Sequence, residues 1–131
     1  MAYATVLSRD PAATYRQVDM VGRTATADGA GLVQLMFDEL LAALRAAAWA
    51  TENQQYTVRS DRVTRATAIL FALEAGLDFD KGGDLSRTLA GLYAGARRTV
   101  LDAAIGHDPR PFRMVADNLA EIAQAWKQIA G

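Results

Sequence analysis

The chain has 131 residues, which fits a single domain that buries about two thirds of the surface its unfolded form would expose. Its 14 basic and 15 acidic side chains give a net charge of −1, so no positive excess is available to neutralise the phosphates of a nucleic acid. We therefore expect no nucleic-acid partner. Because the sequence has no cysteine, the chain forms neither disulfides nor thiolate zinc sites.

Residues 1–27 form the first segment, which is small and polar with scattered larger side chains such as Tyr15. We expect a flexible N-terminal arm over residues 1–27, followed by a helical bundle domain over residues 28–131. The opening residues lack a basic region followed by an apolar core, and no later apolar run approaches the ~20 residues that span a bilayer. The sequence therefore predicts a soluble, cytoplasmic protein without membrane insertion.

A first helix is predicted from Asp28, which can cap its N-terminus, to about Ala50. Large apolar side chains point in several directions around this helix: Leu32, Val33, Leu35, Met36, Phe37, Leu40, Leu41 and Leu44. Two interpretations of this apolar arc stay open. In the first, part of the arc lines an exposed groove that binds an amphipathic helix of another chain, and in the second the whole arc belongs to the core. The same alternatives apply to Tyr93, Met114 and Trp126, although such residues at helical spacing are more often core.

Three further helices follow in chain order. Apolar residues at steps of three and four predict the second helix over about residues 63–77. The third starts near Asp84 and ends at Gly106, a residue type that is common after helix C-termini. The fourth opens at Asp108 and Pro109, because the carboxylate can cap free N–H groups and a proline in the first turn loses no hydrogen bond. Four helices joined by short links predict an all-α fold, an antiparallel four-helix up-down bundle without a sheet.

The stretch LDFDKGGDLSR, residues 77–87, suggests at first a calcium loop or a phosphate loop. Counting Asp78 as position one of a calcium loop puts Leu89 where a bidentate glutamate is required. A phosphate loop would need a GK[ST] ending, and three acidic side chains would repel the anion. We interpret the glycine pair as a turn between antiparallel helices, with the glycines at left-handed backbone angles, and we expect no metal site.

Catalytic groups are scarce in this sequence. The only histidine, His107, falls in the link before the fourth helix, where a histidine is more often solvated than a general base. A di-iron bundle would need repeated Glu-x-x-His motifs, which one histidine cannot supply. We therefore expect no enzyme, no catalytic residue and no cofactor.

Several short motifs occur in a fixed order along the chain. They are Tyr15 in the arm, TADG at 26–29, LVQLMFD at 32–38, Leu77-Asp78, Gly82-Gly83-Asp84, Leu92-Tyr93, Arg97-Arg98, His107-Asp108 and Ala125-Trp126-Lys127. This ordered set resembles the flagellin-specific export chaperones of the FliS family over nearly the whole chain from Tyr15 onward. The sequence departs from the family pattern at Asp28-Gly29, at Phe37 and at Ala94-Gly95-Ala96, where side-chain bulk is missing.

The resemblance implies a cytoplasmic export chaperone that binds the disordered C-terminal segment of flagellin, prevents premature polymerisation and aids delivery to the flagellar export gate. Whether the protein forms a homodimer is a question that the resemblance leaves open. The residues expected to bind a partner are Tyr15, Leu32, Leu35, Met36, Phe37, Leu41, Leu92, Tyr93 and Trp126. The polar arm with its few apolar side chains adds a hypothesis: the arm, anchored by Tyr15, lies over part of the client groove in the free protein.

A function from a different class also stays open, namely a small helical-bundle signalling or regulatory protein of the phosphotransfer or anti-sigma type. Such a protein would act through His107 or a charged face. A phosphotransfer histidine lies exposed in the middle of a helix, whereas Pro109 and Pro111 follow His107 almost at once. That spacing argues against the phosphotransfer alternative.

Overall fold

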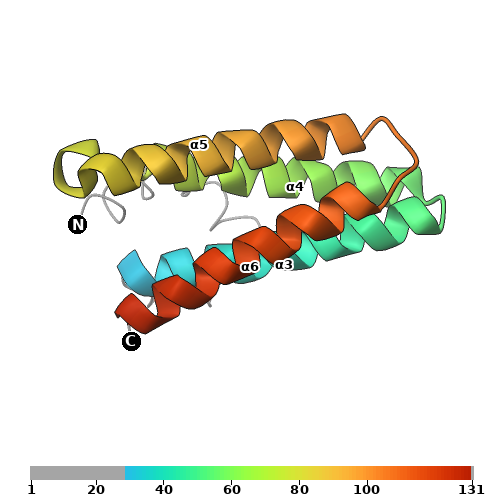
Figure 1. Cartoon of the computed structure of the whole chain (residues 1–131). Coiled ribbons are helices and arrows are strands. Elements are labelled where there is room, and N and C mark those ends of the chain that lie inside the picture. The colour runs from blue at the N-terminus through green and yellow to red at the C-terminus, as the bar shows by residue number, and fades with distance from the viewer. Residues whose placement is uncertain (1–28, 131) are drawn as a thin grey trace.

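A computed structural model gives the fold and describes residues 29–130, with the side chains of residues 31–128. Its helices are α3 (Gly29–Glu52), α4 (Tyr56–Ala75), α5 (Phe79–Ala103) and α6 (Arg110–Ala130). Successive helices run in opposite directions (Figure 1), and residues 29–130 contain no strand. The prediction of an all-α, antiparallel four-helix bundle is confirmed. The predicted arm, with Tyr15, lies outside the described residues.

Helix α3 makes the most extensive contacts of the four helices, because it packs closely along both α4 and α6. Neighbours therefore cover two of its sides. Its buried large side chains, each with at most 1% of its surface exposed, are Leu32, Val33, Met36, Phe37, Leu40 and Leu44. The wide apolar arc of this helix thus follows from packing on two sides.

Helices α5 and α6 form the least extensive neighbouring contact of the bundle. Helix α5 packs mainly along α4, and α6 packs mainly along α3. Figure 1 shows α5 and α6 joined through residues 104–109 at one end and diverging toward the other. This divergence opens a surface between two helices that a closed bundle would cover. None of the helices within residues 29–130 combines the length and apolarity needed to cross a bilayer.

The start of α5 contains the glycine pair noted in the sequence. Asp78 caps the first turn, because its carboxylate accepts a hydrogen bond from the backbone N–H of Lys81 at 3.0 Å. Gly83 then interrupts the helix with φ 53° and ψ −124°, which confirms the left-handed backbone angle predicted for this glycine. Gly82 keeps helical angles, so the same prediction is wrong for that residue. The helix resumes after this kink, and the structure adds a short helical turn, from Phe79, that the sequence analysis assigned to the turn. Among residues 29–130, no three histidine, aspartate or glutamate side chains gather to hold a metal ion.

The opposite end of the bundle is held by contacts between the start of α4 and the α5–α6 link. Arg59 donates a hydrogen bond from Nη1 to the carbonyl oxygen of Gly106 at 2.6 Å, and its guanidinium lies 4.5 Å from the ring centroid of Tyr56. The Tyr56 hydroxyl lies 3.1 Å from Nδ1 of His107. These contacts fix the point from which α5 and α6 diverge.

Asp108 begins the last helix as the sequence predicted. Its carboxylate accepts a hydrogen bond from the backbone N–H of Arg110 at 2.9 Å, and Nη2 of the same arginine lies 2.8 Å away. The side-chain hydrogen bond from Arg110 lowers the pKa of Asp108 below its ordinary value. The carboxylate is therefore ionised at neutral pH and favours the N-terminus of α6.

Candidate partner-binding groove

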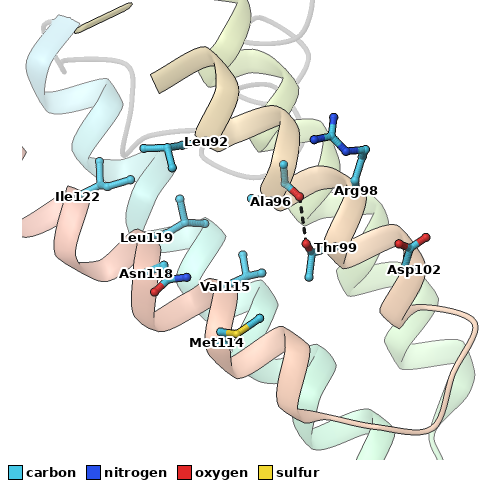
Figure 2. A pocket seen from close by; sticks show the side chains of 11 residues that line it. Leu92, Ala96, Arg98, Thr99, Asp102, Met114, Val115, Asn118, Leu119 and Ile122 are labelled. Carbon is cyan, nitrogen blue, oxygen red and sulfur yellow. Dashed lines mark hydrogen bonds between the residues drawn. The ribbon is translucent and has the colours of Figure 1, made fainter. Parts of the chain in front are cut away.

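A groove with a volume of about 440 Å³ lies between α5 and α6. Helix α5 lines it with Leu92, Gly95, Ala96, Arg98, Thr99 and Asp102. Helix α6 lines it with Met114, Val115, Asn118, Leu119 and Ile122. In Figure 2 the side chains of Leu92, Val115, Leu119 and Ile122 point into the space between the two helices. The groove is thus the space between two facing walls, one formed by α5 and the other by α6.

The two walls differ in the size of their side chains. On α5 the central positions are small, with Gly95, Ala96 and Thr99 in succession along one side. On α6 the lining positions are large and, apart from Asn118, apolar. Two large side chains stay exposed at the margins, Leu92 at 47% and Met114 at 56%. Exposed apolar area next to an open groove is typical of a surface that another chain covers.

Four polar side chains, Arg98, Thr99, Asp102 and Asn118, take part in lining the groove. The hydroxyl of Thr99 donates to the carbonyl oxygen of Gly95 at 3.1 Å, so this polar group is satisfied within α5. The other polar lining residues, Arg98, Asp102 and Asn118, are exposed to solvent. The groove therefore combines apolar side chains with exposed polar groups.

Each wall is held from behind by the helix on which it packs. Nη1 of Arg97 on α5 lies 2.7 Å from Oε1 of Glu74 on α4. The rings of Tyr93 and Phe37 lie with centroids 6.4 Å apart and join α5 to α3. The second wall has its own ion pairs, Arg45 with Asp117 and Arg113 with Glu52, which join α6 to α3. These contacts hold the walls in place without closing the groove.

A smaller hollow of about 280 Å³ continues the groove toward the α5–α6 link. It shares Thr99 and Asp102 with the groove and is completed by Ala103, Gly106, Asp108 and Pro111. The groove therefore extends toward the point where the two helices meet.

The partner-binding residues predicted from the sequence occupy different places. Leu92 lines the groove. Four of them are buried in the core: Leu32, Met36, Phe37 and Tyr93. Leu35, Leu41 and Trp126 are partly buried against the core, and Tyr15 lies outside the described residues. The described groove thus includes one of the nine.

The sequence alone predicts a binding role for few of the residues that line the groove. Val115, Leu119 and Ile122 follow the helical spacing that is typical of core residues. Val115 and Leu119 are indeed buried, at 5% and 2% exposed, and they also line the groove. Gly95 and Ala96 stand out in the sequence for their missing bulk. The spacing marks the face of each helix that turns toward a neighbour. It does not say which pair of neighbouring helices stands apart, and that depends on the whole bundle.

Comparisons with known proteins agree with the resemblance found in the sequence. The model of a family described as Flagellar protein FliS matches residues 11–131. The flagellar secretion chaperone FliS of Salmonella typhimurium is 32% identical over 117 residues, which cover 88% of this chain and 87% of that protein. The flagellar secretion chaperone FliS of Vibrio cholerae is 25% identical over 115 residues, covering 88% and 85%. The flagellar secretion chaperone FliSB of Pseudomonas aeruginosa is 27% identical over 116 residues, covering 88% and 92%. Since the family model spans almost the entire sequence, the chain belongs to the FliS family of flagellar proteins.

Proposed function

We propose that this chain is a flagellar secretion chaperone and that its α5–α6 groove binds the C-terminal segment of flagellin. The observation that carries the proposal is the groove itself, in which two helices of a bundle stand apart and leave large apolar side chains exposed. Relatives that align with most of the chain bear the name flagellar secretion chaperone. A chaperone of this kind needs a surface for an unfolded client, and an apolar groove suits a segment that becomes an amphipathic helix on binding.

The client segment covers more surface than the groove alone offers. Coupled folding and binding costs about 2–5 kcal/mol in ordering and typically buries about 1,000–3,000 Å². Leu85 is 62% exposed and lies seven residues before Leu92 on the same side of α5. We therefore expect the segment to continue from the groove over Leu85 toward the α4–α5 turn.

The partner-binding residues predicted from the sequence take two roles in this proposal. Leu92 contacts the client directly, because its side chain lines the groove. The buried Phe37 and Tyr93 support the α5 wall from the core, where their rings are in contact. Leu32 and Met36 fill the same core, with Leu35, Leu41 and Trp126 at its margin. Tyr15 remains the proposed anchor of the arm.

Binding of this kind explains how a chaperone would act on flagellin. A C-terminal segment held in the groove is withheld from the contacts that polymerise flagellin, so premature assembly in the cytoplasm is prevented. The bound client is then delivered to the flagellar export gate, where the segment must leave the groove. A homodimer that pairs two grooves is a competing use of the same apolar surface.

Calorimetry tests the proposal directly. The flagellin C-terminal peptide of the source organism should bind with a negative heat-capacity change, because apolar surface is buried. Leu92→Asp should weaken binding by about tenfold or more, since a charge would enter an apolar interface. Leu101→Asp is the matched control, because Leu101 is 50% exposed on the same helix and does not line the groove. Absence of binding to the unmodified chain, or equal weakening by both variants, would contradict the proposal.

The described position of His107 disfavours the phosphotransfer alternative. The residue lies in the link between α5 and α6, and its Nδ1 is in contact with the hydroxyl of Tyr56. A phosphotransfer histidine is presented from the middle of a helix, whereas His107 lies outside the helices. Replacing His107 with glutamine should accordingly leave motility unchanged, whereas loss of motility with normal protein levels would support the regulatory alternative.

A further inference from the structure

Gly95 is a glycine in the interior of a helix, at a position where the free protein would be more stable with another residue. It lies inside α5, with helical backbone angles, where glycine lowers helix stability relative to alanine. A Cβ atom added at Gly95 would meet only Nη2 of Arg98, at 3.9 Å, which is an ordinary contact with the end of a flexible side chain. Nothing in the described bundle requires a glycine here.

Gly91, one helical turn earlier, provides the comparison. A Cβ atom added there would meet nothing within 4 Å, and the backbone is also helical. Gly91 is exposed and does not line the groove, whereas Gly95 does. Both glycines thus lower the stability of the helix relative to alanine. They differ in their surroundings, because Gly95 lines the groove and Gly91 faces solvent.

The surroundings of Gly95 leave the backbone of α5 accessible from the groove. Its neighbour along the wall is Ala96, and Thr99 turns its hydroxyl back to the Gly95 carbonyl oxygen at 3.1 Å. On the opposite wall Val115 and Leu119 point toward this small surface (Figure 2). Val115 and Leu119 are 5% and 2% exposed, so they present only the edge of the core to the groove. A large apolar side chain that enters the groove against this edge would reach the helix backbone at Gly95.

We infer that Gly95 sets the specificity of the groove by allowing a large apolar side chain of the client to rest directly on α5. This inference rests on the proposed function, because it takes the flagellin C-terminal segment as the occupant. The distance between two packed helix axes depends on the side chains at their contact, so the absence of a side chain at Gly95 lets the client helix lie closest there. The selected client feature is a bulky aliphatic or aromatic residue that packs against Val115 and Leu119 on its other side.

Four variants separate this role from helix stability. Gly95→Ala and Gly91→Ala should both raise the Tm by about 3–6 °C, because alanine is the better helix former at either position. Calorimetry with the flagellin C-terminal peptide should then show binding weakened about threefold by Gly95→Ala and roughly 5- to 100-fold by Gly95→Leu, because the contact is overpacked. Gly91→Ala and Gly91→Leu should bind within about twofold of the unmodified chain, as surface substitutions away from an interface do.

A complementary change in the client provides the second readout. A set of peptides is made in which each large apolar residue of the flagellin segment is replaced in turn by alanine. One of these peptides should bind the Gly95→Leu chain more tightly than the unmodified peptide binds it. The inference would be overturned, and the proposed function would stand, if the unmodified chain binds the peptide and the Gly95 variants bind it with the same affinities as the Gly91 variants. Failure of every alanine peptide to restore binding would also overturn it. No binding by the unmodified chain would overturn the proposed function and the inference together.

Discussion

Gly83 occupies a backbone conformation that other residues avoid. Its φ of 53° and ψ of −124° interrupt α5 directly after the first turn, which Asp78 caps. Side chains at such angles are strained whatever space surrounds them, and nothing lies within 4 Å of an added Cβ atom. Gly83→Ala should therefore lower the free energy of unfolding by about 1–3 kcal/mol, as measured by urea denaturation.

Gly91→Ala is the control for this prediction, because Gly91 has helical angles and free space around it. That variant should raise the free energy of unfolding by about 0.5–1 kcal/mol. Opposite signs for the two substitutions would assign the cost at Gly83 to its backbone angle. A Gly83 variant as stable as the unmodified chain would show that the kink relaxes without cost.

At the scale of single residues, the sequence was informative where local chemistry decides the structure. The positive φ at Gly83 and the capping by Asp108 follow from the residue types and their immediate neighbours. The close approach of Ser86 to Gly82 was not predictable in this way. Oγ of Ser86 would lie 1.9 Å from a Cβ atom on Gly82, because that hydroxyl donates to the carbonyl oxygen of Asp78 across the turn.

At the scale of helices, the link between α5 and α6 depends on one buried cation. Arg59 is 9% exposed, donates to the carbonyl oxygen of Gly106 at 2.6 Å and lies over the ring of Tyr56. Arg59→Met keeps most of the apolar stem but leaves that carbonyl without this donor. The substitution should lower the free energy of unfolding by about 1–3 kcal/mol in urea denaturation.

Tyr56→Phe tests the neighbouring contact by removing only the hydroxyl that meets His107. Since this contact is exposed, the loss should stay below about 1 kcal/mol. A larger effect for Tyr56→Phe than for Arg59→Met would mean that the tyrosine, and not the arginine, holds the link.

The periodicity of the sequence identified the four helices because each has a buried side. Helix α6 illustrates the limit of that signal. Phe112 is fully buried, whereas Val115 and Leu119 are buried against the core and also line the groove, and all three belong to the same apolar spacing. A stripe that packs on a neighbour and a stripe that faces a groove follow the same rule along one helix. The opening between α5 and α6 belongs to the arrangement of the whole bundle, in which α5 packs mainly along α4 and α6 mainly along α3.

At the scale of the whole molecule, the arm is proposed to compete with the client for the groove. The arm lies outside the described residues, and the proposal follows from its few apolar side chains, with Tyr15 as the anchor. A groove that is covered for part of the time binds more weakly in proportion to the uncovered fraction. Deletion of residues 2–22 should therefore tighten binding of the flagellin peptide several-fold and increase aggregation of the free chain.

Calorimetry and light scattering on the truncated and full chains measure both effects. Tyr15→Ala in the full chain is the narrower variant and should reproduce part of the gain in affinity. Equal affinity and equal solubility after the deletion would show that the arm does not contact the groove. Weaker binding would show that the arm holds the client in place.

The most direct test of the groove as the client site is the set of nuclear Overhauser effects between a methyl-labelled chain and an unlabelled flagellin C-terminal peptide. The methyl groups of Leu92, Met114 and Leu119 should show contacts with the peptide, because they line the groove between α5 and α6. The methyl groups of Leu101, exposed on the same helix but outside the groove, should show none. Peptide contacts that appear at Leu101 and are missing from Leu92, Met114 and Leu119 would contradict the assignment of this groove to flagellin.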